Sequence, residues 1–392
     1  MKTNLSPFFQ ANYRKLAFSA LALFSLLLIG CSAAGASGEG LAGAAGAQET
    51  LVADSLTATP AGNIATPEPT ALMPEKPSDL PTAALGPRGQ IVYIAKMSDG
   101  RTEVMLASAD GSSQPVALTN DGAPKDTPVL SPDGQFLAYA ASLNNNLDIY
   151  MLRLSDQTVT RLTSSTAKDG WPSWSHDGRL VTFESFRDGN FEIYAVDIQT
   201  LAETRLTNLA AGDGRPTWSP DGRWLLFVSN RDGSAGIYRM DADGGNILAL
   251  AVGDAPNASP AWSPDGQSIA FTSWRDGNPE IYLMNADGSN PRRLTSNNAY
   301  DDYPVWSPDG RSLLFTNGKN GEEKVRRISV DGGIPQSLLA DDGAAVYPAW
   351  SPDGAYVAYQ GQNMIYIVDL TGNIVQRISA SQQQASEPVW IP

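Results

Sequence analysis

A four-residue motif recurs along this chain at a fixed interval, and that interval constrains the fold more than any other feature. Each interval holds four short runs rich in β-branched and aromatic residues, separated by turn sequences such as PDG, RDG and ADG. Four strands repeated every 40–45 residues or so are typical of a β-propeller blade. The copies follow one another at steps of 44 residues: Ser131-Pro132-Asp133-Gly134, Ser175-His176-Asp177-Gly178, Ser219-Pro220-Asp221-Gly222, Ser263-Pro264-Asp265-Gly266, Ser307-Pro308-Asp309-Gly310 and Ser351-Pro352-Asp353-Gly354.

The repeats also predict how the ring closes. Two fragments remain outside the complete units: 91–119, which has the second, third and fourth strands of a blade, and 387–392, which has only a first strand. Because the two fragments complete each other, pairing them would leave no sheet edge open between the chain ends. The sequence therefore predicts an all-β, seven-bladed β-propeller over 86–392, with four-stranded blades and with the C-terminal strand joining the N-terminal blade. The complete units are 127–163, 171–207, 215–251, 259–295, 303–339 and 347–379.

The repeated residues have physical roles in such a blade. Proline cannot donate to a ladder, so it suits the innermost strand, which is a sheet edge at the central channel. A tryptophan follows two residues later on the same face, where its indole can pack against the next blade, as in the pair Pro260 and Trp262. In the SPDG turn, proline and glycine suit a tight bulged hairpin, and the aspartate can bond the local backbone.

This pattern of PxWSPDG, RDG, IY and LT resembles the TolB-type propeller repeat, the WD40-like PD40 family, over 86–392. The resemblance implies a non-catalytic role in protein interactions at the bacterial cell envelope. TolB itself is similar in fold. The resemblance implies that TolB has an α/β domain followed by six blades, whereas this chain has a polar coil followed by seven blades.

The N-terminal region predicts export and membrane attachment. Three basic residues precede an apolar run, Leu16 to Ile29, that is short for a membrane span and typical of a secretory signal peptide over 1–30. The run ends at Cys31, the only cysteine of the chain, in a sequence that resembles a bacterial lipobox. We expect lipidation of Cys31, a disordered linker rich in Ala, Gly, Ser, Thr and Pro over 31–85, and anchoring at the outer membrane or cell surface.

Charge and composition narrow the partners. The formal charge is −15, which argues against nucleic acid and against an anionic membrane surface, so that membrane contact is expected only through the lipid. It favours envelope proteins with basic or cationic patches, bound by a monomer. The one histidine, His176, replaces the proline of an SPDG turn, and no G-x-S-x-G occurs, so we expect no catalytic site. A histidine or thiolate metal site is likewise not expected, no cofactor is predicted, and only an oxygen-ligated Ca²⁺ at the channel mouth stays open.

The loops between blades supply the candidate binding residues. One aligned column places acidic or amide side chains where the blade-to-blade loops meet the channel: Asp169, Asp213, Asn257 and Asp301. We expect these four to form an acidic channel mouth that binds basic groups. The RDG tripeptides, which begin at Arg187, Arg231 and Arg275, could be a recognition motif, but their identical place in each blade favours turn chemistry.

The predicted function is a lipid-anchored, non-catalytic interaction scaffold. A pure assembly scaffold with no defined ligand, for which no single face matters, is one alternative, and two others stay open. The first is a carbohydrate-binding propeller that uses exposed aromatic residues such as Trp274 and Tyr300, whereas Tyr303 begins a strand and is expected to be packed. The second is a polysaccharide-processing enzyme, since some polysaccharide lyases resemble this repeat family. Those enzymes use metal-binding histidines that this chain does not have.

Overall fold

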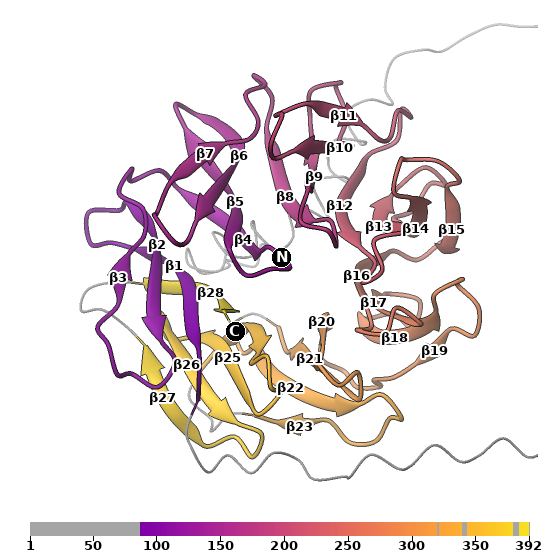
Figure 1. The fold of residues 1–392 in the computed structure, drawn as a ribbon. Helices are drawn as coiled ribbons and strands as arrows, with labels where there is room; N and C mark the ends of the chain where they lie inside the picture. The colour runs from indigo at the N-terminus through magenta and orange to yellow at the C-terminus, as the bar shows by residue number, and fades with distance from the viewer. Residues whose placement is uncertain (1–86, 320, 339–342, 379–383, 392) are drawn as a thin grey trace, which may run out of the picture.

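The computed structural model describes residues 87–319, 321–338, 343–378 and 384–391, and these form a single ring of antiparallel sheets (Figure 1). The leader, Cys31 and the linker over 31–85 lie outside the described residues. Seven four-stranded sheets surround a central channel, and every sheet runs from an innermost first strand to an outermost fourth strand. The prediction of an all-β, seven-bladed propeller is confirmed. None of the described residues forms a helix that could cross a membrane.

The blades are numbered from the one that contains β1. Their innermost strands, blade 1 first, are β28 (Gln384–Ile391), β4 (Lys125–Leu130), β8 (Asp169–Trp174), β12 (Asp213–Trp218), β16 (Asn257–Trp262), β20 (Asp301–Trp306) and β24 (Ala345–Trp350). The second strands are β1 (Gln90–Lys96), β5 (Phe136–Leu143), β9 (Leu180–Ser185), β13 (Trp224–Ser229), β17 (Ser268–Ser273), β21 (Ser312–Asn317) and β25 (Tyr356–Gly361). The third strands are β2 (Thr102–Ser108), β6 (Asn146–Arg153), β10 (Glu192–Asp197), β14 (Gly236–Asp241), β18 (Glu280–Asn285), β22 (Lys324–Ser329) and β26 (Met364–Asp369). The fourth strands are β3 (Val116–Ala117), β7 (Val159–Arg161), β11 (Glu203–Arg205), β15 (Leu248–Ala251), β19 (Arg292–Arg293), β23 (Gln336–Ser337) and β27 (Ile374–Ile378).

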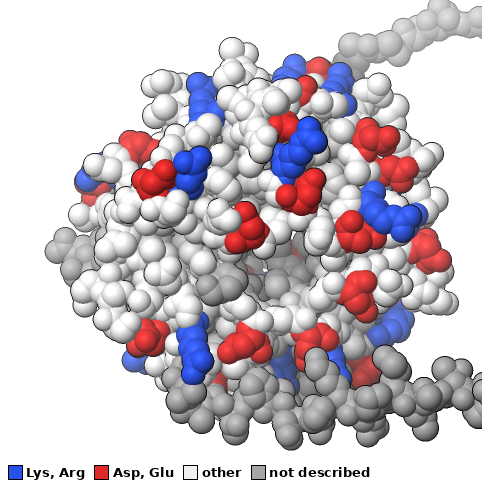
Figure 2. All heavy atoms as spheres, in the orientation of Figure 1, with Lys and Arg blue, Asp and Glu red and all other residues white. Residues whose placement is uncertain are grey.

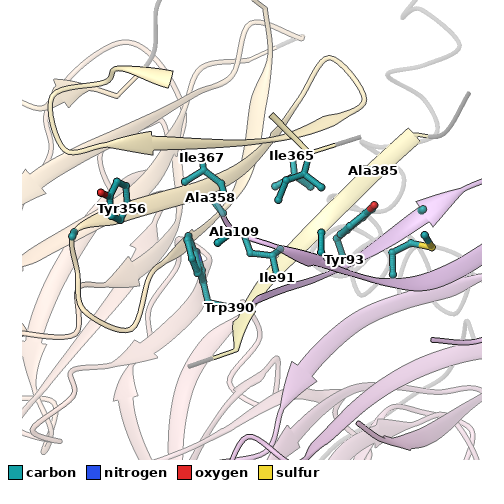
Figure 3. Packing of buried hydrophobic residues seen from close by; sticks show 14 residues of the cluster. Ile91, Tyr93, Ala109, Tyr356, Ala358, Ile365, Ile367, Ala385 and Trp390 are labelled. Atoms are coloured by element: carbon teal, nitrogen blue, oxygen red, sulfur yellow. The ribbon is translucent and has the colours of Figure 1, made fainter. Parts of the chain in front are cut away.

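Blade 1 joins the two ends of the chain, as the repeats predict. Strand β1 pairs with β2 on one side and with the C-terminal β28 on the other, in the order β28-β1-β2-β3. Figure 3 shows the core that this pairing creates, in which Trp390 and Ile91 of blade 1 face Ile367 and Tyr356 of blade 7. The ring is thus closed by hydrogen bonds within blade 1 and by apolar packing between blades 1 and 7.

The tryptophans of the first strands join each blade to the one before it. Trp174 packs in a cluster with Ala138 and Ile149 of blade 2 and donates its Nε1–H to the carbonyl of Val129, 3.0 Å away. The prediction that the indole packs against the neighbouring blade is therefore confirmed, and a hydrogen bond is added to it. Equivalent bonds, over 3.0, 3.3 and 3.2 Å, run from Trp306 to Ala261, Trp350 to Val305 and Trp390 to Ala349.

The SPDG turns are stabilised by their own serine and aspartate. In the turn of blade 5, Ser263 Oγ donates to Asp265 Oδ1 over 2.5 Å and accepts the amide of Ser268 over 2.9 Å. The serine hydroxyl lowers the pKa of Asp265, so the carboxylate stays ionised in its turn. Gly266 has φ of +69°, a left-handed conformation that favours glycine. The same bonds recur in the other five copies, so the turn aspartates have a structural role.

Candidate functional site

The four residues predicted for an acidic mouth lie inside their blades. Asp169, Asp213 and Asp301 have no exposed surface, and Asn257 is 2% exposed. Each is the first residue of an innermost strand. Its side chain points into the blade, where it contacts a partner from the same blade. In three of the four blades that partner is the arginine of the RDG tripeptide.

The RDG arginine is a clamp within the blade. Arg187 Nη2 lies 3.0 Å from Asp169 Oδ2, and Arg231 Nη2 lies 2.8 Å from Asp213 Oδ2. In blade 5, Arg275 Nη2 donates to the amide oxygen of Asn257 over 3.2 Å, so the pattern persists without a charge pair. The arginine stacks on the aromatic side chains of its own blade, and its Nε donates to a serine at the end of the second strand. The RDG sequences therefore hold the hairpin to the first strand, beyond forming its turn.

In blade 6, two asparagines rather than an arginine bind the buried aspartate. Asn317 Nδ2 donates to Asp301 Oδ1 over 2.5 Å, and Asn297 Nδ2 donates to Oδ2 over 2.7 Å. These amides carry no charge that could neutralise the carboxylate of Asp301. Burial therefore raises its pKa to about 6. Burial also raises the pKa of Asp213, against the effect of its hydrogen-bond donors Ser229 and Arg231.

A second set of buried acids, which the sequence analysis missed, lies at the start of the third strands. Glu192 and Glu280 are fully buried and accept hydrogen bonds from Thr207 and Thr295, the threonines of the LT landmark. Glu103 is the corresponding buried acid of blade 1, and the buried Lys125, which is the first residue of blade 2, lies beside it, with its Nζ 3.3 Å from Glu103 Oε2. Across the described residues, no cluster of three or more histidine, cysteine, aspartate or glutamate side chains could hold a metal ion.

The channel itself is lined by a different column of residues, the one directly before the proline of each innermost strand. We call this column the bulge ring. Its seven members each have φ between 50° and 57°. In every innermost strand the ladder shifts register at this point, as a β-bulge requires. The bulge ring consists of Thr127, Trp171, Arg215, Ser259, Tyr303, Tyr347 and Glu387.

The bulge ring differs from the rest of the strand in being unrepeated. Proline follows it in all seven blades and tryptophan in six, whereas the ring position itself holds six different residue types, from serine to tryptophan. All seven side chains are partly exposed, as expected of a channel wall. Figure 2 shows a hollow at the centre of one face of the ring, with acidic side chains around it. The residues before proline in the aligned repeats were the signal that could have located this column.

The ring side chains meet one another across the channel. Arg215 of blade 4 stacks on Trp171 of blade 3, with its guanidinium carbon 4.3 Å from the ring centroid. Its Nη2 also donates to the hydroxyl of Tyr303 in blade 6 over 3.3 Å, although blade 5 lies between them in the ring. Two non-adjacent blades can exchange such a contact only over the channel. Tyr303, predicted to be packed, is thus partly exposed and part of the wall.

Carboxylates at the channel satisfy the amides that the bulges leave without a ladder partner. Glu184 Oε2 accepts the amide of Arg215 over 3.0 Å, and Asp302 Oδ1 accepts that of Tyr303 over 2.7 Å. The amide of Thr127 is bonded by Glu387 over 2.7 Å. Burial raises the pKa of Glu184 to about 6, and Arg215 opposes that rise. Gly214 lies close beside this carboxylate, since an added Cβ would be 2.4 Å from Glu184 Oε2 and the carboxylate would have to shift.

The aromatic residues considered for carbohydrate binding lie away from the ring. Trp274 is partly buried at the hairpin of blade 5, and Tyr300 is 38% exposed with the ammonium of Lys319 5.5 Å from its ring centroid. His176 is exposed in its turn. None of the three is among the bulge-ring side chains.

This ring of four-stranded blades, with the same motif residues at each turn, defines a family. The family model described as the TolB beta propeller domain (PD40) matches residues 88–259 and 250–362. The chain therefore belongs to the TolB β-propeller, or PD40, family. A comparison with curated proteins found no match.

Solved structures agree on the fold. TolB from Acinetobacter baumannii is 24% identical, with a TM-score of 0.52, and the alignment covers 78% of this chain and 67% of that one. A structure described as putative TolB from Agrobacterium tumefaciens is 26% identical over 70% of this chain and 100% of the other, also with a TM-score of 0.52. An oligogalacturonate lyase in complex with manganese is 16% identical, with 73% and 85% covered and a TM-score of 0.55, which shows a shared fold alone.

Proposed function

We propose that the protein is a non-catalytic, lipid-anchored binding scaffold of the cell envelope, which holds a protein partner at the bulge ring. The observation that carries the proposal is that the ring residue differs from blade to blade, whereas its neighbours in the strand recur. The first strands keep the proline in all seven blades and the tryptophan in six, but they accept serine, tyrosine or arginine at the ring position. Side chains released from a structural role at the centre of the ring are available for recognition.

The composition of the ring supports a protein partner. Trp171, Tyr303 and Tyr347 supply the large, rigid aromatic surfaces that dominate protein interfaces. The chain as a whole is acidic, with a formal charge of −15, and this favours approach by a partner with a basic surface. Membership of the TolB family and the leader sequence are both consistent with a place outside the cytoplasm.

The test is affinity capture from the envelope fraction of the source organism, with the full-length protein in detergent as bait. The variant changes Tyr303 and Tyr347 to Ser, which is the residue that blade 5 already carries at this position as Ser259. The control changes Leu209, which is exposed in the loop between blades 3 and 4, to Ser. We expect a protein that is retained by the native chain and by the control and lost from the double variant. Equal recovery by all three baits would refute binding at the ring.

A second candidate, a carbohydrate-binding propeller, is favoured by the stacked arrangement of Arg215 on Trp171, which resembles a platform for a sugar ring. A glycan array probed with the same three proteins separates the two. Binding to a defined glycan that the Tyr303→Ser, Tyr347→Ser variant loses would support the carbohydrate function. Protein capture without glycan binding would support the scaffold.

A further inference from the structure

The guanidinium of Arg215 makes few polar contacts for a group set inside a protein ring. An arginine side chain has five N–H donors. Its one hydrogen bond to a side chain is the 3.3 Å bond from Nη2 to Tyr303, and its Nε is buried with no partner among the described residues. Buried donors in native structures nearly always have partners, so this arginine is expected to be completed by water or by a group from outside the chain.

The carboxylates near Arg215 already accept hydrogen bonds from other groups. Glu184 and Asp302 each accept the amide of a bulge residue, and Asp302 Oδ1 also accepts the hydroxyls of Ser259 over 3.0 Å and Thr272 over 2.7 Å. Both acids attract Arg215 from a distance, but within the described part of the chain neither of them forms a direct ion pair with its guanidinium. The clamp arginines behave differently, since Arg187 and Arg231 are each paired with a buried aspartate.

The stack on Trp171 holds the guanidinium in place. The guanidinium carbon lies 4.3 Å from the indole centroid of Trp171 and 5.7 Å from the ring centroid of Tyr303, so two aromatic side chains contact Arg215. A guanidinium is planar and presents its donors in one plane, which matches a planar carboxylate. Preorganisation of this kind lowers the entropic cost of binding.

We propose that Arg215 is a carboxylate-binding subsite at the centre of the channel, which receives one acidic side chain or the C-terminal carboxylate of a partner peptide. The inference rests on the proposed function and adds the chemistry of the anchor residue. The acidic protein attracts a basic partner surface, and a single acidic side chain in that surface accepts hydrogen bonds from Arg215.

A peptide fits this site better than a polyuronate chain does. Four carboxylates lie at or beside the ring, those of Asp126, Glu184, Asp302 and Glu387. A polymer with an acid on every sugar would place several charges against them, whereas a peptide needs only one acid, at Arg215. Like charges opposed in a confined, partly buried site repel strongly, because the dielectric constant there is lower than in water.

The experiment measures binding of the full-length protein to capped hexapeptide libraries that carry one aspartate or glutamate in a neutral sequence. Matched libraries with asparagine or glutamine, and trigalacturonate, are the other probes. The variants are Arg215→Gln, Arg215→Lys and, as a control, Arg223→Gln, which changes an exposed arginine of the same blade. The NMR signal of the Arg215 Nε–H, assigned by its absence from Arg215→Lys, reports directly on whether a ligand engages that group.

We expect acidic peptides to bind at least tenfold more tightly than their amide counterparts, with this preference lost in Arg215→Gln, reduced in Arg215→Lys and kept in Arg223→Gln. The Nε–H signal should shift on binding. Failure of the native protein to prefer acidic peptides, or retention of the preference by Arg215→Gln, would overturn the proposal. So would preference for trigalacturonate over every peptide. If the captured partner depends on Tyr303 and Tyr347 but is recovered equally by Arg215→Gln, the binding scaffold stands and the carboxylate subsite falls.

Discussion

Nη2 of Arg231 lies 2.8 Å from Oδ2 of Asp213, and this pair joins the RDG hairpin of blade 4 to the start of its own innermost strand. The two residues are 18 positions apart, and the aspartate has no exposed surface. A buried pair of this kind contributes little net energy when intact, because desolvation offsets attraction. Loss of one partner is costly, however, since it leaves a charge buried and unpaired.

Arg231→Ala should lower the free energy of unfolding by about 3–5 kcal/mol. The expected loss is larger at pH 8 than at pH 5, because burial already raises the pKa of Asp213 and the acid can take up a proton at the lower pH. Urea denaturation of the full-length protein is the measurement. The matched control is Arg101→Ala, which breaks the exposed pair with Asp99 and should cost far less, because solvent screens that pair. Equal costs for the two variants would contradict the clamp.

Trp306→Phe should cost more than Trp262→Phe, although the two tryptophans occupy the same position of neighbouring blades. Trp306 Nε1 donates to the carbonyl of Ala261 over 3.0 Å, whereas Trp262 Nε1 is buried with no partner among the described residues. The difference should be about 1 kcal/mol, the net value of one hydrogen bond. Thermal unfolding of both variants measures it, and a larger loss for Trp262→Phe would argue against the inter-blade bond.

Glu184→Gln should stabilise the protein at pH 8 and have no such effect at pH 4. Burial raises the pKa of Glu184 to about 6 in the folded state, above its ordinary value of 4.5. The folded protein therefore holds this proton more tightly than the unfolded chain, and the ionised acid costs stability that appears between pH 4.5 and 6. Above pH 6 the gain from the neutral amide should be about 1–2 kcal/mol. The substituted side chain would still accept the amide of Arg215 through its carbonyl oxygen, so the bulge keeps its bond. The check is denaturant unfolding as a function of pH, and a gain that is constant across this range would rule out titration of Glu184 as its source.

A chain that stops after residue 383 should lose cooperative folding, because it leaves β1 as an open edge and removes Trp390 from the core between blades 1 and 7. Addition of a synthetic peptide of residues 384–391 should restore a folded ring. Circular dichroism and size-exclusion chromatography follow both steps. The control peptide carries Trp390→Ala, and full rescue by that peptide would show that the indole is not needed for closure.

Most of the fold could be predicted from the sequence, because every blade repeats the same strand and turn motifs. The 44-residue period indicated the number of blades, and the two incomplete units at 91–119 and 387–392 indicated the closure of the ring. The prolines and tryptophans could be placed because a ladder and a core impose chemical requirements on single positions.

The site could not be predicted in the same way. Asp169 and Asp213 fall in loop sequences that look free, and nothing in their immediate neighbourhood shows that an arginine 18 residues later will fold back onto them. The column of Thr127, Trp171 and Arg215 was hidden for the opposite reason. Residues that match no repeat do not stand out in the sequence, and only their constant place before the proline of each first strand could have located the column.

The closure of blade 1 also decides how the propeller responds to a pull on its N-terminal side. The chain enters the ring through β1, which is not an edge strand but lies between β2 and β28, with paired residues along both of its sides. A tether that drags on this strand must break two ladders together, whereas a peripheral strand such as β3 is held by one. The proposed N-terminal anchor would therefore pull on a strand that two ladders hold, which would let the propeller keep a partner while the surface that carries it moves.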